Sequence, residues 1–344
     1  MKALILKEYN KIVYDEVSEP TLSTDAVMIR VKACGICGSD VHGMDGSTGR
    51  RIPPIIMGHE AAGVITAVGD GVRDFRPGDR VTFDSTVYCG ACYFCRRGEI
   101  NLCDNRRVLG VSCEEYRLHG AFAQYVAVPE RVLYRLPDGL SFERAAMVEP
   151  CSIAFHAVAR AQVRLHEAAV VVGSGMIGLL IIQALKLSGC GQIIAVDLED
   201  RKLELARQLG AQGALNPSRQ DVVAEVRRLT GNRGADMAFE VVGISPAVQM
   251  AIACARKGGR VVLVGNLAPA VEFPLQAAVT RELTVLGCCA SRGEYPACLD
   301  MIAQGRVNVD FLISAIAPLE EGASWFERLR SKEQGLMKVI LKPE

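Results

Sequence analysis

The chain has 344 residues, and its 39 basic and 39 acidic side chains give a formal net charge of zero. This balance excludes a polybasic nucleic-acid binder and an acidic interaction tail, and the length predicts about two domains. Half of the residues are hydrophobic and 23% are charged, as in globular rather than disordered proteins. The odd number of cysteines, 13, and the lack of a secretory leader at the start predict a cytoplasmic, reducing location with free or metal-bound thiols.

Short alternating or β-branched runs dominate the first part of the chain. They cover residues 27–31, 63–68, 80–83 and 125–128, and turn residues separate them. This pattern predicts a compact, mostly antiparallel, β-rich domain.

From residue 167 onward, strand and helix signals alternate. The predicted strands are 169–172, 193–196, 237–242 and 260–264, and the predicted helices are 176–187, 201–209 and 247–255. Such alternation predicts a parallel, doubly wound α/β sheet with right-handed crossovers. Weaker signals follow for a strand at 283–286, a helix near 296–303 and a strand near 339–342.

One uncharged stretch, residues 168–185, has the length expected of a membrane helix. It begins with a β-branched run, turns at Gly173-Ser174-Gly175 and continues with helix formers. A strand, a glycine turn and a helix therefore explain it better than a membrane span.

The same glycine turn has the spacing of a dinucleotide-binding motif, Gly-x-Gly-x-x-Gly. The predicted coenzyme contacts in it are Gly173, Gly175, Met176, Ile177 and Gly178. The glycines permit a tight turn and let the backbone approach a pyrophosphate at a helix N-terminus, while Asp197, after the next strand, is placed to accept hydrogen bonds from the ribose. The alternative is an ordinary strand–helix turn that needs glycine for packing.

The charge of Asp197 favours NAD over NADP, because a carboxylate at the ribose 2′ position repels a 2′-phosphate. Arg201, one turn into the next helix, is still placed to approach the adenine end. Val242 and Val264, at the ends of two later strands, complete the expected coenzyme contacts.

Four cysteines have the sharpest metal-ligand spacing in the chain: Cys89, Cys92, Cys95 and Cys103. Four thiolates fill a tetrahedral shell, so a zinc ion there would be structural. Coincidence in a cysteine-rich chain and an iron–sulfur cluster are the alternatives.

A second candidate metal site is split between two segments. Cys37 opens the run Cys-Gly-Ser-Asp-Val-His, and His59 and Glu60 follow Gly58. Thiolate, imidazole and carboxylate together suit a catalytic zinc ion, because three protein ligands leave a position open for water or substrate. Considered separately, each residue has an alternative to metal binding: His59 is typical of a hydrogen-bonded turn residue, and Cys37 is typical of a small core residue.

These motifs together resemble the zinc-dependent medium-chain dehydrogenase/reductase (alcohol dehydrogenase) family, in its sorbitol or polyol dehydrogenase-like branch. The resemblance covers nearly the whole chain. It includes Gly58-His59-Glu60-Ala61-Ala62-Gly63, the segment with the four cysteines Cys89, Cys92, Cys95 and Cys103, Val148-Glu149-Pro150 and the glycine turn. It implies a GroES-like catalytic domain at 1–152, a Rossmann NAD-binding domain at 153–287, and a segment at 288–344 that returns to the catalytic domain.

The resemblance also implies roles for single residues. Cys37, His59 and an acidic group, Glu60 or Glu149, would bind the catalytic zinc ion, and the alternative for Glu149 is a cap or ion pair before a helix starting near Ser152. Ser39 would receive the proton of the substrate alcohol, and His42 would relay it. The alternatives are that Ser39 only stabilises a turn and that His42 is only a solvent-exposed histidine. Hydride would pass from the alcohol carbon to NAD.

The chain differs from sorbitol dehydrogenases at positions that concern the substrate. Sorbitol dehydrogenases proper usually have Tyr where Gly43 stands and Arg-Tyr shortly after the glycine matching Gly287, whereas here Arg292 is displaced. Arg292 either serves a substrate carboxylate or phosphate or points to solvent. We therefore expect a secondary alcohol on a polyol, sugar acid or sugar phosphate, with no nucleic-acid or membrane partner.

The sequence is also compatible with other functions. An L-threonine 3-dehydrogenase-like enzyme shares the same residue pattern, and a zinc- and NAD-binding sensor or scaffold without catalysis is an alternative of another class. Both metal motifs disfavour a zinc-free quinone reductase. The resemblance also implies a homodimer or homotetramer, and the remaining cysteines are expected to be buried or pocket thiols: Cys34, Cys113, Cys151, Cys190, Cys254, Cys288, Cys289 and Cys298.

Overall fold

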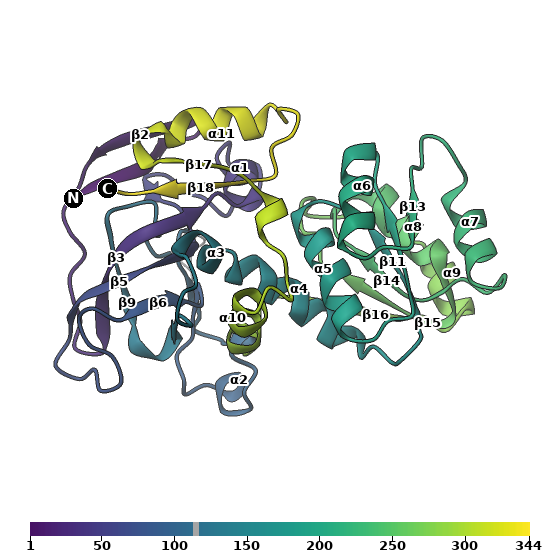
Figure 1. Ribbon diagram of the computed structural model, residues 1–344, viewed down its shortest axis with the longest axis horizontal. Coiled ribbons are helices and arrows are strands. Elements are labelled where there is room, and N and C mark those ends of the chain that lie inside the picture. The colour runs from purple at the N-terminus through teal and green to yellow at the C-terminus, as the bar shows by residue number, and fades with distance from the viewer. Residues whose placement is uncertain (113–116) are drawn as a thin grey trace. The chain divides into compact units, whose positions relative to one another are not determined.

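The computed structural model describes residues 1–112 and 117–344, and the chain separates into two compact units. The first, here called the β unit, combines Met1–Glu149 with Arg292–Glu344, and the second, the α/β unit, is Pro150–Ser291. The N-terminal and C-terminal segments therefore share one unit, as the purple and yellow ribbons show in Figure 1. The predicted buried thiol Cys113 lies outside the described residues.

The β unit is built mainly of short antiparallel strands, as predicted. Its strands are β1 (Lys2–Glu8), β2 (Lys11–Glu16), β3 (Ala26–Gly35), β4 (Ile55–Ile56), β5 (Glu60–Val68), β6 (Arg80–Phe83), β7 (Thr86–Val87), β8 (Arg107–Val108), β9 (Tyr125–Pro129), β10 (Leu133–Arg135), β17 (Ile313–Pro318) and β18 (Lys338–Lys342). Its helices are α1 (Gly38–Gly43), α2 (Tyr93–Arg96), α3 (Phe142–Ala146), α10 (Tyr295–Ala303) and α11 (Gly322–Arg330), and α4 (Val148–Ala161) begins at its end.

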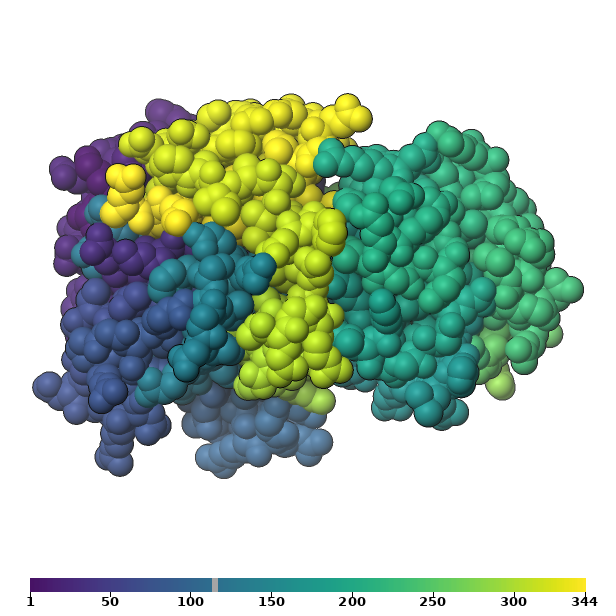
Figure 2. Space-filling view, viewed as in Figure 1, coloured from purple at the N-terminus to yellow at the C-terminus, as the bar shows by residue number. Residues whose placement is uncertain are grey.

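The C-terminal strand is part of the main sheet of the β unit. This sheet has the order β10-β6-β5-β3-β18-β17, with β9 also paired to β3. β18 is antiparallel to β3 and places Ile340 opposite Gly35, whereas β17 and β18 are parallel. In the space-filling view the yellow C-terminal segment packs against purple N-terminal atoms (Figure 2). The C-terminal strands β17 and β18 therefore belong to the same sheet as β3, which carries Cys34 and Gly35, just before Cys37.

Close packing of strands in this sheet depends on glycine. A Cβ at Gly63 of β5 would collide with the backbone carbonyl of Arg30 on β3. On one side of the sheet the core includes Phe122 and Phe326, whose rings meet edge to face at 5.8 Å between centroids. Helix α11, which carries Phe326, is thereby packed by apolar contact against the segment that precedes β9.

The α/β unit has the predicted parallel sheet. Its strands are β11 (Ala168–Val172), β12 (Gln192–Val196), β13 (Gly213–Leu215), β14 (Ala235–Glu240), β15 (Ala255–Leu263) and β16 (Thr284–Gly287), and its helices are α5 (Met176–Leu187), α6 (Asp200–Leu209), α7 (Val222–Leu229), α8 (Ser245–Cys254) and α9 (Leu275–Thr280). The order β13-β12-β11-β14-β15-β16 reverses direction between β11 and β14. In such sheets ligands bind beyond the carboxyl ends of the strands at this reversal.

The uncharged stretch 168–185 forms β11, the glycine turn and the first part of α5, as predicted. β11 is buried along its whole length, which explains its continuous apolar sequence. Among the helices of the described residues, none has both the length and the apolar character needed to cross a bilayer.

Candidate metal and dinucleotide sites

The structure brings Cys37, His59 and Glu60 together. Their ligand atoms all lie within 4.8 Å of one another. The fold produces this group directly, because Gly35 at the end of β3 pairs with Glu60 at the start of β5. Gly58 turns the chain with φ +91° just before His59.

Cys37 is held by the helix that follows it. Its Sγ accepts hydrogen bonds from the Ser39 backbone N–H at 3.4 Å and from the Ser39 hydroxyl at 3.2 Å. Its own backbone N–H donates to Asp40 Oδ2 at 3.4 Å, so Cys37 caps α1. The sulfur therefore has a defined position next to Ser39.

A buried carboxylate, Asp40, stands behind His59. Asp40 Oδ1 lies 3.6 Å from His59 Nδ1 and accepts hydrogen bonds from Arg51 Nε at 3.2 Å and Nη2 at 2.8 Å. A carboxylate on Nδ1 favours the tautomer whose other ring nitrogen, Nε2, has the lone pair that binds a metal.

A second buried ion pair involves Glu60. Lys338 of β18 donates from Nζ to Glu60 Oε2 and, at 2.8 Å, to the Ile36 carbonyl, and both charged side chains are fully buried. Gly35 leaves room for the pair, since a Cβ there would collide with Glu60 Oε2. Burial by itself lowers the pKa of Lys338, but the charge and hydrogen bond of Glu60 together with the charges of Cys37 and Glu149 outweigh burial and raise that pKa.

The donor set fits a divalent metal ion. Buried Glu60 Oε1 has no hydrogen-bond partner among the described residues. Burial and the Glu60 carboxylate raise the pKa of the Cys37 thiol to about 12, so only a nearby cation stabilises its thiolate near neutral pH. Sulfur, nitrogen and oxygen donors together are typical of a catalytic zinc site.

Glu149 does not belong to this tight group of three. It lies in the first turn of α4, which begins at Val148, so the alternative of a cap before a helix starting near Ser152 is wrong. Burial raises the pKa of Glu149 well above its usual value, His59 opposes this shift, and Glu60 and Cys37 add to it. Glu149 is therefore within electrostatic range of all three ligand candidates.

The two predicted proton-transfer residues lie on α1. Ser39 is exposed, and its hydroxyl also accepts a hydrogen bond from Arg51 Nη2 at 3.3 Å. His42, in the last turn of the same helix, is exposed and lies outside the metal-ligand group.

The four cysteines of the predicted structural site form the other metal-ligand group: Cys89, Cys92, Cys95 and Cys103. The Sγ atoms of Cys92 and Cys103 are 3.8 Å apart, and those of Cys89 and Cys95 are 4.0 Å apart. Four sulfurs at about 2.3 Å from a tetrahedral zinc ion lie about 3.8 Å from one another. These separations match that geometry and exclude a disulfide, whose S–S bond is about 2.05 Å.

Backbone amides support negative charge on this lobe. Cys89 Sγ accepts from the N–H groups of Ala91 at 3.5 Å and Cys92 at 3.4 Å, and these bonds lower the pKa of Cys89 to about 6. By contrast, burial raises the pKa of Cys95 to about 12. The loop itself thus favours the thiolate of Cys89, whereas Cys95 needs the positive charge of a metal ion.

In the α/β unit the glycine turn joins β11 to α5. Gly173 has φ +98°, and a Cβ at Gly178 would collide with the Gly173 carbonyl. A Cβ at Gly175 would meet nothing within 4 Å. The first and third glycines are therefore required by the protein's own packing, while the space beside Gly175 is open for a ligand.

Asp197 lies beside this turn. Its carboxylate accepts hydrogen bonds from the backbone N–H groups of Ser174 at 2.8 Å and Glu199 at 3.0 Å. The negative charge is thus fixed next to the turn, and each oxygen keeps a lone pair for a ribose hydroxyl.

The other residues predicted to contact the coenzyme lie on helices α5 and α6 and at the ends of strands β14 and β15. Met176 and Ile177 are partly exposed in the first turn of α5, and Arg201 is exposed on α6. Val242 follows β14 and lies against Gly173, and Val264 directly follows β15.

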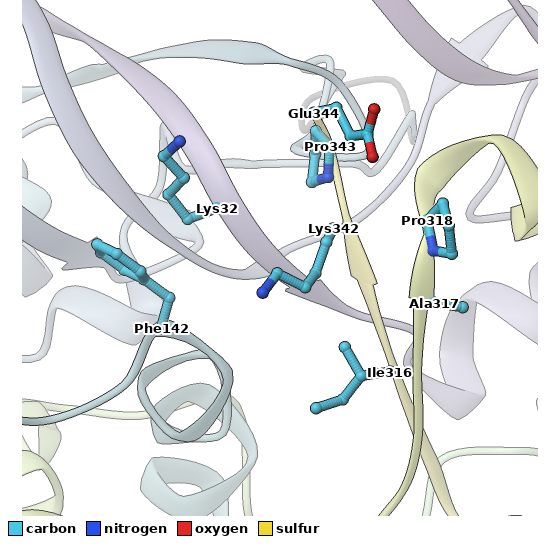
Figure 3. Close-up of a pocket in the computed structure, with 8 residues that line it drawn as sticks. All are labelled: Lys32, Phe142, Ile316, Ala317, Pro318, Lys342, Pro343 and Glu344. Atoms are coloured by element: carbon cyan, nitrogen blue, oxygen red, sulfur yellow. The ribbon is translucent and has the colours of Figure 1, made fainter.

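Neither Arg292 nor any residue that lines the pocket of Figure 3 is a metal-ligand residue. Arg292 is 43% exposed, with Nη1 4.0 Å from Glu99 Oε1, and is not among the metal-ligand residues. The pocket drawn in Figure 3, of about 380 Å³, contains none of the predicted site residues. Its Lys342 donates a hydrogen bond to Glu143 at 2.7 Å.

Three residues around the metal-ligand group were not predicted as site residues: Asp40, Arg51 and Lys338. Asp40 stands within the motif that begins at Cys37, and Lys338 directly precedes a buried apolar run, which is an unusual place for a lysine. No local pattern marks Arg51, because it follows another arginine in a turn-rich segment.

Comparison with known proteins supports both units. The family model described as "Alcohol dehydrogenase GroES-like domain" matches residues 23–138, and "Zinc-binding dehydrogenase" matches residues 177–304. Sorbitol dehydrogenase of Bacillus subtilis is 35% identical over all of this chain and 97% of its own length, and L-idonate 5-dehydrogenase of Vitis vinifera is 35% identical over 86% and 81%. A solved zinc-binding dehydrogenase from Sinorhizobium meliloti, bound to NADP, has a TM-score of 0.91 at 32% identity and covers 99% of both chains.

Proposed function

This chain belongs to the zinc-dependent alcohol dehydrogenase family, and we propose that it oxidises a secondary alcohol of a polyol, sugar acid or sugar phosphate to the ketone with NAD. The observation that carries this proposal is the grouping of Cys37, His59 and Glu60 beside the Ser39 hydroxyl in a chain that also has a dinucleotide turn. A zinc ion supplies Lewis acidity, which lowers the pKa of an alcohol in one direction and polarises a ketone in the other.

The chain's own residues perform the remaining steps. Cys37, His59 and Glu60 hold the metal, with Glu149 close enough to adjust the charge of the site. Ser39, an exposed residue whose Oγ lies 3.2 Å from Cys37 Sγ, relays the proton of the substrate hydroxyl: Oγ accepts this proton as the serine hydroxyl releases its own toward His42. His42 passes this proton toward solvent. A second zinc ion on the four-cysteine lobe is structural.

The coenzyme is bound by the α/β unit. The backbone at Gly175 approaches the pyrophosphate, and Asp197 receives the adenosine ribose and selects NAD over NADP by charge. NAD held there would supply the acceptor for the hydride of the alcohol carbon.

A substrate panel tests this function. Purified, zinc-loaded protein is given NAD with polyols, sugar acids, sugar phosphates or L-threonine, and NADH formation is followed with and without a chelator. We expect turnover in one of the first three classes and its loss with chelator. Turnover of L-threonine alone would identify the alternative dehydrogenase, and no turnover of any class would contradict an enzymatic function.

We also propose that the protein is a homo-oligomer in the cytoplasm. β16 is an edge strand that pairs with β15 alone among the described strands, and Val285 on it is 36% exposed. On the neighbouring helix α9, Leu275 and Val279 are each 66% exposed. A second copy covering this edge would bury these side chains. Light scattering tests this: Leu275→Lys with Val279→Glu is expected to reduce the mass to that of a monomer.

A further inference from the structure

We propose that Arg51 is a positioning residue of the metal site, which fixes the Ser39 hydroxyl and, through Asp40, the ring of His59. The proposal rests on the proposed function for the role of Ser39, but its link to the metal ligands is independent of the substrate. Arg51 is only 3% exposed and Asp40 is fully buried, so their charges interact with little solvent screening.

One guanidinium group serves several partners. Nε and Nη2 donate to Asp40 Oδ1 at 3.2 and 2.8 Å, and Nη2 also donates to Ser39 Oγ at 3.3 Å. Nη1 donates to the Arg50 carbonyl at 3.2 Å, which fixes the plane of the group. Only a planar fork of N–H donors reaches these acceptors together, so lysine cannot replace it fully.

Through Asp40 this guanidinium acts on two metal-ligand candidates. Oδ1 of Asp40 faces His59 Nδ1 at 3.6 Å, while Oδ2 accepts the Cys37 backbone N–H at 3.4 Å. Without Arg51, Asp40 would be a buried carboxylate without its cation and would move from its present position. This movement would release the ring of His59 from its orientation.

Arg51 also fixes the direction in which the hydroxyl group of Ser39 points. Arg51 occupies one lone pair of Oγ, and the hydroxyl proton points to Cys37 Sγ at 3.2 Å. One lone pair remains free to accept the proton of a substrate. The positive charge of Arg51 also stabilises negative charge that develops next to Ser39 in the transition state.

Gly43 provides the space that Arg51 needs. A Cβ built on Gly43, in the last turn of α1, would lie 2.5 Å from Arg51 Cγ and 3.4 Å from its Cβ. The contact is near the base of the side chain, so Arg51 cannot avoid it by moving only its tip. Gly43→Ala is therefore a way to displace Arg51 without changing its chemistry.

The test compares Arg51→Met, Arg51→Lys and Gly43→Ala with Arg50→Met, a matched control at the exposed neighbouring arginine. Zinc release to a chelator and the visible spectrum of the Co²⁺-substituted protein report on the metal ligands without any turnover. We expect Arg51→Met to release zinc about 10- to 100-fold faster and to shift the Co²⁺ bands. Arg51→Lys and Gly43→Ala should show smaller shifts in the same direction, and Arg50→Met should match the wild type.

Kinetics test the link to Ser39. Arg51→Met should lower kcat with little change in KM for NAD, and its effect should be much smaller in a Ser39→Ala background. Unchanged zinc release and Co²⁺ spectra in folded Arg51→Met would overturn the proposal; if that variant does not fold, unchanged spectra in Arg51→Lys and Gly43→Ala would do so. A wild-type protein that turns over no alcohol would contradict the proposed function, while the metal measurements would still decide the role of Arg51.

Discussion

Lys338, on the last strand, is the buried counter-charge of Glu60, which lies 278 residues earlier on β5. Their side chains are both fully buried, and Lys338 also donates to the Ile36 carbonyl, immediately before Cys37. The metal-ligand group therefore depends on a residue from the opposite end of the chain.

Removing this counter-charge should destabilise the β unit. Lys338→Met leaves Glu60 buried without a cation, and we expect the free energy of unfolding to fall by about 3 kcal/mol. Urea unfolding measures this change. Lys342→Met, which breaks the more exposed pair with Glu143, should cost below about 1 kcal/mol. Equal losses in the two variants would show that burial of the Lys338–Glu60 pair is not what matters.

The two metal-ligand groups should respond differently to loss of one cysteine. Cys37→Ser should abolish turnover while the protein stays folded, because the site on β3 and β5 is embedded in a complete sheet. Cys95→Ser should instead lower the melting temperature, since the lobe around α2 has no buried residue in that helix and depends on its metal ion. Zinc content, circular dichroism and turnover separate the two effects. The division of roles would be wrong if both variants lost folding to the same extent.

Coenzyme choice should depend on Asp197. Asp197→Ala removes the carboxylate that repels a 2′-phosphate, so the preference for NAD over NADP, as a ratio of kcat/KM, should fall about tenfold or more, which corresponds to about 1.4 kcal/mol. Glu204→Ala, on the exposed face of α6, is the charge-matched control and should keep the wild-type ratio. An unchanged ratio in Asp197→Ala would assign coenzyme selection to other residues.

Acid stability of the α/β unit should depend on Asp236. Burial raises the pKa of this carboxyl group, but hydrogen bonds from the Ala168 N–H at 2.8 Å and from Arg256 Nε at 2.6 Å, together with the charges of Arg256 and Arg260, outweigh burial, so the net pKa lies below its usual 3.8. A lowered folded-state pKa stabilises the fold above the unfolded value and loses this contribution as the pH falls through the folded value.

Asp236→Asn should therefore be less stable than the wild type at pH 7, by about 1 kcal/mol. The difference should shrink below about pH 4, where the wild-type carboxyl group also becomes protonated. Urea unfolding of both proteins across this range measures it. A difference that stayed constant with pH would mean that the ionised form of Asp236 is not what stabilises the strands.

Prediction from sequence succeeded where the determinants are local. The limits of α5 follow from the glycine turn before it, and Gly210, with φ +127°, ends α6 where expected. The prediction at 237–242 extended too far, because Glu240 Oε1 accepts the N–H groups of Val242 and Gly243 and bends the chain there. A side-chain bond to the backbone of this kind leaves no periodic signal.

At the metal site, motif spacing identified the ligand candidates but not the charges around them. Asp40 lies within the motif of Cys37, yet its partner Arg51 follows in an irregular segment, and Lys338 is joined to Glu60 only by the pairing of β18 with β3. Such contacts depend on tertiary structure, so neither local composition nor periodicity reports them.

The return of the chain to its first sheet also sets an order of events during synthesis. A ribosome completes the α/β unit before β17 and β18 have emerged, so that unit can fold first although it is second in sequence. Until β18 docks beside β3, the nascent β unit contains Glu60 without its ammonium partner. The buried ion pair beside the metal-ligand group therefore forms only after β18 has been synthesised, and a product truncated before β18 lacks Lys338 although it contains Cys37, His59 and Glu60.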